Sequence, residues 1–216
     1  MIQMSQAQPS IVIVDYGVGN TYSVSNAVQA LGYKRLKISA DEKEIMSADA
    51  LVLPGVGAFA TCAANLRERY LDVILQEAVH GKDKPILGIC VGMQLMATQS
   101  EENGIHLGLD WIPGQVVRLA PPDGKDVPHV GWNDVESSSS SQLFARTPDW
   151  TNFYFDHSYE YVCDAKSDIV AYCDYGKPIV AAISRRNIFG VQFHPEKSQM
   201  AGLKMFRSFF NMVASC

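Results

Sequence analysis

The stretch Lys84-Pro85-Ile86-Leu87-Gly88-Ile89-Cys90-Val91-Gly92-Met93-Gln94-Leu95 decides the fold. Its apolar first half predicts a buried strand, and a helix is expected directly after it. Gly88 and Gly92 stand two residues on either side of Cys90, which gives the cysteine form of the Gly-x-Ser-x-Gly nucleophile elbow. In such an elbow, a sharp turn holds the nucleophile in a strained backbone conformation, and the flanking glycines leave room for it. The stretch therefore predicts an α/β sheet with a nucleophile at the end of one strand.

The elbow also predicts how Cys90 becomes reactive. A sulfur above the start of a helix lies near free N–H groups and the positive end of the helix dipole, which favour the thiolate. The N–H of Val91 is placed to bind a developing oxyanion. A buried structural cysteine is the ordinary alternative for any cysteine, but the strand, the two glycines and the helix together favour a nucleophile.

The segments before the elbow alternate short apolar runs with helical patterns. Asn20 is expected to open a helix that Gly32 ends, and a long helix is expected over residues 60–80. Strands are expected over residues 11–14, 33–38, 50–53 and 85–89. Alternation of this kind predicts a parallel sheet with helices on both faces.

The second half is typical of antiparallel strands followed by a last helix, at residues 200–213. Strands are expected over residues 115–119, 130–136, 152–155, 169–173, 179–184 and 188–193. No linker separates two halves. The sequence thus predicts one α/β domain, residues 11–216, with a central mixed and mostly parallel sheet flanked by helices, after a polar extension at residues 1–10.

A second motif, Gln192-Phe193-His194-Pro195-Glu196-Lys197-Ser198, ends the last predicted strand. A nucleophilic cysteine needs a base within reach, and the base needs a third group to hold its tautomer. His194 and Glu196 have the chemistry for these two roles. A lone histidine after a strand is more often a structural residue, but the nearby carboxylate and the elbow favour the catalytic interpretation.

A glycine-rich loop, Pro54-Gly55-Val56-Gly57, follows the third predicted strand. Loops at the carboxyl ends of parallel strands converge on the functional site. A backbone N–H of this loop is a candidate second oxyanion donor, and a simple tight turn is the alternative.

Composition excludes several classes of function. The net charge of −5 is unsuited to non-specific nucleic-acid binding, which needs a basic surface. No apolar stretch is long enough for a membrane span, and the polar start predicts no signal peptide. The five cysteines form no CxxC pair, and the histidines have no metal-ligand spacing, so we expect a reducing, cytoplasmic setting and neither a metal nor another cofactor. Tyr22 occupies the third glycine position of a dinucleotide fingerprint, which excludes that motif.

Together, the elbow, the glycine-rich loop and the His-Pro-Glu motif resemble the class I, or triad, glutamine amidotransferases. Four segments are similar to the branch of that family that serves a cyclase in histidine biosynthesis: residues 15–20, 128–133, 157–159 and 192–198. The resemblance covers nearly the whole chain, from Ile11 to Phe210, and implies the flavodoxin-like fold of that family.

The resemblance implies hydrolysis of glutamine to glutamate and ammonia, and transfer of the ammonia to a (β/α)₈-barrel cyclase subunit in a heterodimer. It implies roles for thirteen residues, in four groups. These are a catalytic triad of Cys90, His194 and Glu196; an oxyanion hole at Val56, Gly57 and Val91; glutamine contacts from Gln94, His157, Ser158 and Tyr159; and a partner-facing set of Asn20, Trp132 and Lys197.

One residue departs from the pattern, and three other functions stay open. Glu160 stands where the family leads us to expect an aromatic residue, which concerns the glutamine contacts. The alternatives are the glutaminase of another synthase, such as anthranilate or guanylate synthesis, a stand-alone cysteine hydrolase, and a non-catalytic binding subunit.

Overall fold

The computed structural model describes residues 8–122, 124–138 and 141–214. A nine-stranded mixed sheet runs through the molecule, and a small four-stranded sheet lies beside it. In spatial order the large sheet consists of β2 (Leu36–Ser39), β1 (Ile11–Val14), β3 (Ala50–Gly55), β4 (Ile86–Cys90), β13 (Ile188–Val191), β12 (Pro178–Arg185), β11 (Ile169–Asp174), β8 (His129–Ser137) and β9 (Trp150–His157). The small sheet consists of β10 (Tyr159–Cys163), β7 (Gly114–Arg118), β5 (Gln99–Ser100) and β6 (His106–Leu107).

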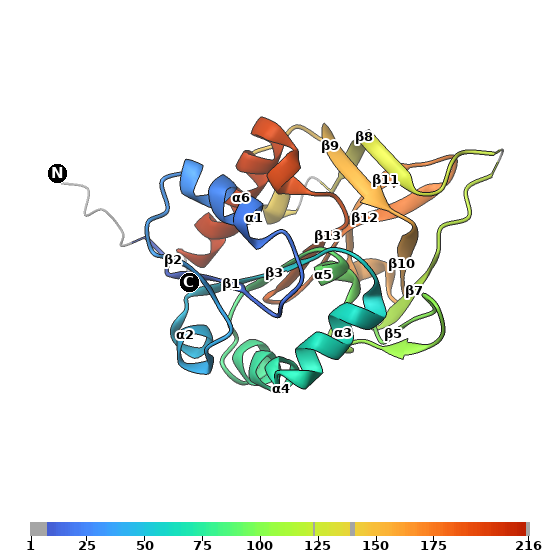
Figure 1. The fold of residues 1–216 in the computed structure, drawn as a ribbon. Coiled ribbons are helices and arrows are strands. Elements are labelled where there is room, and N and C mark those ends of the chain that lie inside the picture. The colour runs from blue at the N-terminus through green and yellow to red at the C-terminus, as the bar shows by residue number, and fades with distance from the viewer. Residues whose placement is uncertain (1–7, 123, 139–140, 215–216) are drawn as a thin grey trace.

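Helices cover both faces of the large sheet, as Figure 1 shows. Two of them, α1 and α6, lie on one face, and α2, α3 and α4 lie on the other. Their bounds are α1 (Thr21–Ala30), α2 (Glu42–Ser47), α3 (Phe59–Glu68), α4 (Leu71–Gln76), α5 (Val91–Gln94) and α6 (Gln199–Val213). The strands β1, β3 and β4 are buried along their whole length, because helices cover both of their sides.

The sheet changes character at β13, and this change positions the site. From β2 to β13 neighbouring strands pair in parallel, and from β13 to β9 they pair antiparallel. The carboxyl ends of β3, β4 and β13 therefore meet at one edge, which is where parallel sheets place their sites. The expected single domain with a mixed, helix-flanked sheet is confirmed, although parallel and antiparallel pairings are equally many rather than mostly parallel.

The expected long helix over residues 60–80 is wrong. Tyr70 adopts a left-handed backbone conformation, with φ of 57°, and separates α3 from α4. After α4, the helical segment ends in a π-helical turn, Glu77–Gly81. The helix α2 and the strands β5, β6 and β10 were not expected. Most of the polar extension, residues 1–7, lies outside the described residues.

Candidate active site

The elbow at Cys90 has the strained geometry that its sequence predicts. Cys90 ends β4 and precedes α5, with φ of 53° and ψ of −112°. Positive φ is unfavourable for a residue with a side chain, so the surrounding packing must hold it. A Cβ atom at Gly92 would lie 1.8 Å from the carbonyl oxygen of Leu53, so only glycine fits there. The elbow is therefore pressed directly against β3.

The helix after the elbow is short. Only Val91–Gln94 is α-helical, and the turns that follow lead away to Trp111 and the small sheet. A single turn aligns few peptide dipoles, so the helix contributes little to stabilising a thiolate. The main electrostatic partner of Cys90 must come from another element.

That partner is His194, which follows β13. Its Nδ1 lies 2.8 Å from Oε1 of Glu196, and both side chains are buried. The His194 backbone N–H donates to the Tyr154 carbonyl at 2.8 Å, and its own carbonyl accepts from the Ser198 hydroxyl at 2.6 Å. Hydrogen bonds thus fix both the backbone of His194 and one nitrogen of its ring.

The pKa of His194 is raised to about 10. Burial alone lowers this pKa, but side-chain hydrogen bonds to Cys90 and Glu196 and the negative charges of both partners outweigh it. His194 therefore keeps its proton at neutral pH. A cationic imidazole beside a cysteine is the arrangement that activates nucleophilic cysteines.

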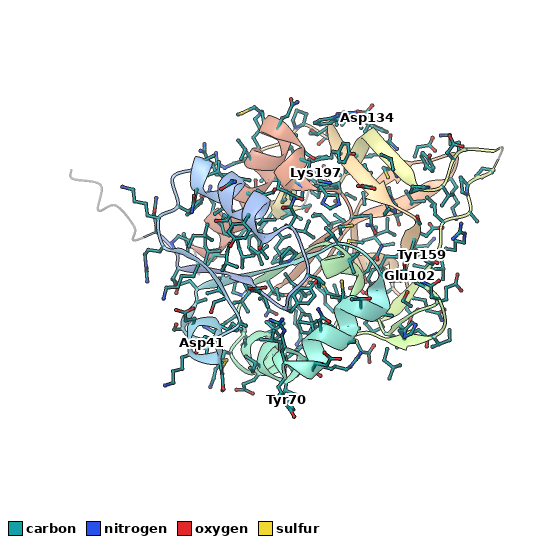
Figure 2. The ribbon with its side chains drawn as sticks, in the orientation of Figure 1. Asp41, Tyr70, Glu102, Asp134, Tyr159 and Lys197 are labelled. Carbon is teal, nitrogen blue, oxygen red and sulfur yellow. The ribbon has the colours of Figure 1, made fainter. Side chains whose placement is uncertain are left out.

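Cys90 and His194 border a cavity of about 280 Å³. Its walls bring together every residue that the sequence assigned to the oxyanion hole and to glutamine: Val56, Gly57, Val91, Gln94, His157, Ser158 and Tyr159. Lys197 also lines it, whereas Glu196, Asn20 and Trp132 do not. Glu102 and Tyr159, both labelled in Figure 2, line this cavity.

Three lining residues were missed from the sequence: Glu102, Pro128 and Asp156. Glu102 accepts a hydrogen bond from the Phe59 N–H, at the start of α3, at 2.7 Å. The Asp156 carboxylate lies 3.7 Å from the Lys197 ammonium. The Lys197 ammonium offsets one of these two carboxylate charges, and the remaining negative charge suits an ammonium group of a ligand.

A chain of two glutamines connects the nucleophile to the opposite wall. The amide nitrogen of Gln94 donates to the Tyr159 carbonyl at 3.2 Å and to Gln192 Oε1 at 3.0 Å. The amide nitrogen of Gln192 lies 3.7 Å from the Cys90 sulfur. Gln192 was also missed, although a fully buried glutamine in an apolar strand is a signal that could have identified it.

Two buried side chains hold the glycine-rich loop from behind. The Tyr16 hydroxyl donates to the Pro54 carbonyl at 2.6 Å, and the Cys62 thiol lies 3.5 Å from the Val56 carbonyl. Because a trans peptide places its N–H and C=O on opposite sides, the Gly57 N–H points away from Cys62. Neither contact could be predicted from the residues alone.

Glu160 does not disturb the cavity. Its buried carboxylate bonds the Lys177 ammonium at 2.5 Å, and it is absent from the cavity lining. The departure from the family pattern at this position therefore forms an ion pair behind the wall, outside the space that the cavity offers to a ligand.

Among residues 8–122, 124–138 and 141–214, no cluster of three or more His, Cys, Asp or Glu side chains could hold a metal ion. No helix within those same ranges is long and apolar enough to span a bilayer.

Selective labelling of Cys90 is the first testable outcome. Burial raises the pKa of Cys62 to about 11 and those of Cys163 and Cys173 to about 12, so these thiols stay protonated. A glutamine-analogue chloroketone should alkylate Cys90 ahead of them, as peptide mass spectrometry would measure. Cys216 lies outside the described residues, and the extent of alkylation of its peptide is compared with that of the Cys90 peptide in the same sample. Labelling centred on Cys62 or Cys173 would contradict the assignment.

Some known proteins are similar to this chain in sequence, and others are similar in structure. The imidazole glycerol phosphate synthase subunit HisH of Zymomonas mobilis is 45% identical over 96% of this chain and 98% of its own. The subunit of the same name from Symbiobacterium thermophilum is 45% identical over 94% of each chain. A putative GMP synthase subunit from Thermoplasma acidophilum has a similar structure, with a TM-score of 0.72, 25% identity and coverage of 96% of this chain and 95% of its own. The sequence model of the family described as glutamine amidotransferase class-I matches residues 12–213. The chain belongs to the class-I glutamine amidotransferase family.

Proposed function

We propose that the chain is the glutaminase subunit of imidazole glycerol phosphate synthase. It hydrolyses L-glutamine to glutamate and ammonia, and it passes the ammonia to a (β/α)₈ cyclase subunit in a heterodimer for histidine biosynthesis. The observation that carries this proposal is Cys90 in a strained elbow at the wall of a cavity that His194, oriented by Glu196, also lines. The near full-length similarity to subunits named HisH supports the choice of synthase.

In the first half of the reaction, the Cys90 thiolate attacks the side-chain carboxamide carbon of glutamine. The carbonyl electrons move onto oxygen, where the Val91 N–H and an N–H of the Val56-Gly57 loop stabilise the oxyanion. His194 then gives its proton to the departing nitrogen as the C–N bond breaks. Ammonia leaves, and a γ-glutamyl thioester remains on Cys90.

In the second half, neutral His194 accepts a proton from water, and the resulting hydroxide attacks the thioester carbon. The C–S bond breaks, glutamate leaves, and the thiolate–imidazolium pair returns. Glu196, at 2.8 Å from Nδ1, keeps the imidazole oriented with its other nitrogen toward Cys90. Side chains, backbone N–H groups and water supply every step.

The glutamine lies against the wall formed by residues 157–159. Gln94 fixes that wall through the Tyr159 carbonyl, and Ser158 and Tyr159 line the cavity beside the substrate. Glu102 and Asp156 lie in the same cavity and complement the substrate ammonium.

The cyclase docks on the face that carries the cavity mouth. Trp132 is 47% exposed and its ring packs edge-on against Tyr154, and Lys197 lies over the Tyr154 ring at 5.3 Å. Asn20 is the N-cap residue of α1, the helix that packs against the Pro195–Lys197 turn. These three residues form one partner-facing set, in a complex that we expect to work in the cytoplasm.

Pairing with different synthases tests the proposal. The chain should support glutamine-dependent synthesis by the barrel cyclase of imidazole glycerol phosphate synthesis, measured by product formation with glutamine as the nitrogen source. It should not support the synthase partners of anthranilate or guanylate formation, which serve as matched controls. Activation of one of those partners instead, or full glutaminase activity without any partner, would overturn the proposal.

A further inference from the structure

Two buried histidines form a row of hydrogen bonds that leads into the glutamine-binding wall. His129 on β8 and His157 on β9 are direct neighbours across the sheet, and His129 Nδ1 lies 3.0 Å from His157 Nε2. His157 Nδ1 lies 2.8 Å from the Tyr159 carbonyl, and His129 Nε2 lies 3.3 Å from the Asn133 amide nitrogen. That amide nitrogen also donates to the Asp174 carbonyl at 2.9 Å.

The hydrogen bonds of the two histidines can run in one direction only. The Tyr159 carbonyl can only accept, so His157 must carry its proton on Nδ1. A neutral His157 then accepts at Nε2, which requires His129 to donate from Nδ1. The remaining nitrogen of His129 accepts from Asn133, which is a donor at that atom. Each tautomer is therefore set by the next residue along the chain.

Both imidazoles are held neutral by their surroundings. Burial, the neighbouring His157 and the Lys125 ammonium lower the pKa of His129 to about 3. Burial also lowers the pKa of His157 to about 4; the Tyr159 carbonyl and Asp156 act in the opposite direction, while His194 lowers it further. Neutral rings are required, because a second proton on either ring would remove an acceptor from the chain.

The hydrogen bonds of the two histidines and those that start at the nucleophile meet at one atom, the Tyr159 carbonyl oxygen. The Tyr159 carbonyl accepts from His157 on one side and from Gln94 on the other. Gln94 continues through Gln192 to the Cys90 sulfur. The carbonyl is thus fixed from two directions, and its position relative to the sulfur depends on both donors.

We infer that His129 is a positioning residue for glutamine binding, which acts through His157 to hold residues 158–159 in place. The inference rests on the proposed function for its substrate. Without the His129 donor, His157 is free to move its proton to Nε2, the more common tautomer in water, and the Tyr159 carbonyl loses a donor. The substrate wall then loses its orientation, while Cys90, His194 and Glu196 keep theirs.

Packing is the competing explanation for His129. Its ring stacks between Phe155, at 4.6 Å, and Tyr175, at 4.0 Å, so any truncation leaves a void. Two substitutions separate the explanations. His129→Phe keeps an aromatic ring in the stack but removes the donor, and His129→Asn keeps a donor near the Nδ1 position but removes the ring.

Both variants should be assayed as glutaminases in complex with the cyclase, with melting temperatures measured alongside. We expect His129→Phe to raise the KM for glutamine about 3- to 10-fold, as loss of one hydrogen bond gives, with kcat nearly unchanged. His129→Asn should keep KM near that of the wild type although its melting temperature falls. Tyr175→Phe, which removes the hydroxyl bond to the Asp126 carbonyl but keeps the stacked ring, is the matched control and should not change KM.

Nitrogen-15 NMR of the histidine side chains tests the chain without any assay of activity. His157 should be in the Nδ1–H tautomer in the wild type and in His129→Asn, and should lose that preference in His129→Phe. A KM that follows melting temperature in both variants, or an unchanged His157 tautomer in His129→Phe, would overturn the inference. A wild-type complex that shows the tautomer but no glutaminase activity would instead contradict the proposed function.

Discussion

Cys90→Ala is expected to abolish glutamine-dependent synthesis by the paired cyclase and to leave ammonia-dependent synthesis nearly intact. The nucleophile acts only in releasing ammonia from glutamine, and loss of a covalent nucleophile typically costs at least ~10⁴-fold in rate. Free ammonia supplied at high concentration bypasses that step. Product formation by the same complex, with each nitrogen source in turn, measures both activities.

Two further variants distinguish loss of the chemistry from loss of the folded assembly. Cys173→Ala removes another buried sulfur, on β11, and should leave both activities in place. Cys90→Ser keeps a side chain of similar shape in the elbow and should behave like Cys90→Ala, because an alcohol is a far weaker nucleophile beside His194 than a thiolate. Equal loss of both activities in the Cys90 variants would mean that Cys90 supports the assembly and not the chemistry.

The second large effect is activation by the partner. Glutaminase turnover should rise at least ~100-fold when the cyclase and its nucleotide ligand are added, because one missing oxyanion donor typically costs ~10²–10³ in rate. The loop at Val56 and Gly57 has the freedom for such a change. Gly57 has φ of 86° and open space around it. On the other side of the same peptide, the Val56 carbonyl accepts a weak hydrogen bond from the Cys62 thiol. Turnover with and without the partner is the measurement.

Lys197→Ala tests where the signal enters. Lys197 lines the cavity and contacts Asp156 and Tyr154, so its loss should reduce the activation while alkylation of Cys90 stays unchanged. Lys43→Ala on α2 is the matched control, since α2 lies across the sheet from α1 and α6 (Figure 1). A free chain as fast as the complex would exclude the switch and favour a stand-alone hydrolase.

The parts of the site predicted from the sequence are those encoded by local spacing. The elbow, the glycine-rich loop and the pair of His194 and Glu196 each occupy a few consecutive residues, and parallel strands bring their ends together. Tyr16 and Cys62 were missed because their roles depend on contacts with Pro54 and Val56 that only the folded chain creates.

Strand register accounts for another failure of prediction. His129 and His157 are 28 residues apart, and they meet because β8 and β9 pair with one particular register. A shift by one residue would place them on opposite faces of the sheet. The break between α3 and α4 was missed for a different reason. Tyr70 adopts a left-handed conformation, which a tyrosine in the sequence does not predict, whereas a glycine or asparagine would have indicated it.

The tight contact between the elbow and β3 has a consequence for amide hydrogen exchange. A Cβ at Gly55 would lie 2.5 Å from the Gly92 nitrogen, so the loop cannot move at that end without displacing the elbow, whereas Gly57 has open space. Amides of β3 and β4 should therefore exchange slowly with deuterium, in step with opening of the sheet, and the Gly57 amide should exchange from the native state. If that amide binds the oxyanion, trapping the acylated enzyme will slow its exchange. Deuterium uptake at one peptide would then report directly how often the oxyanion hole is formed.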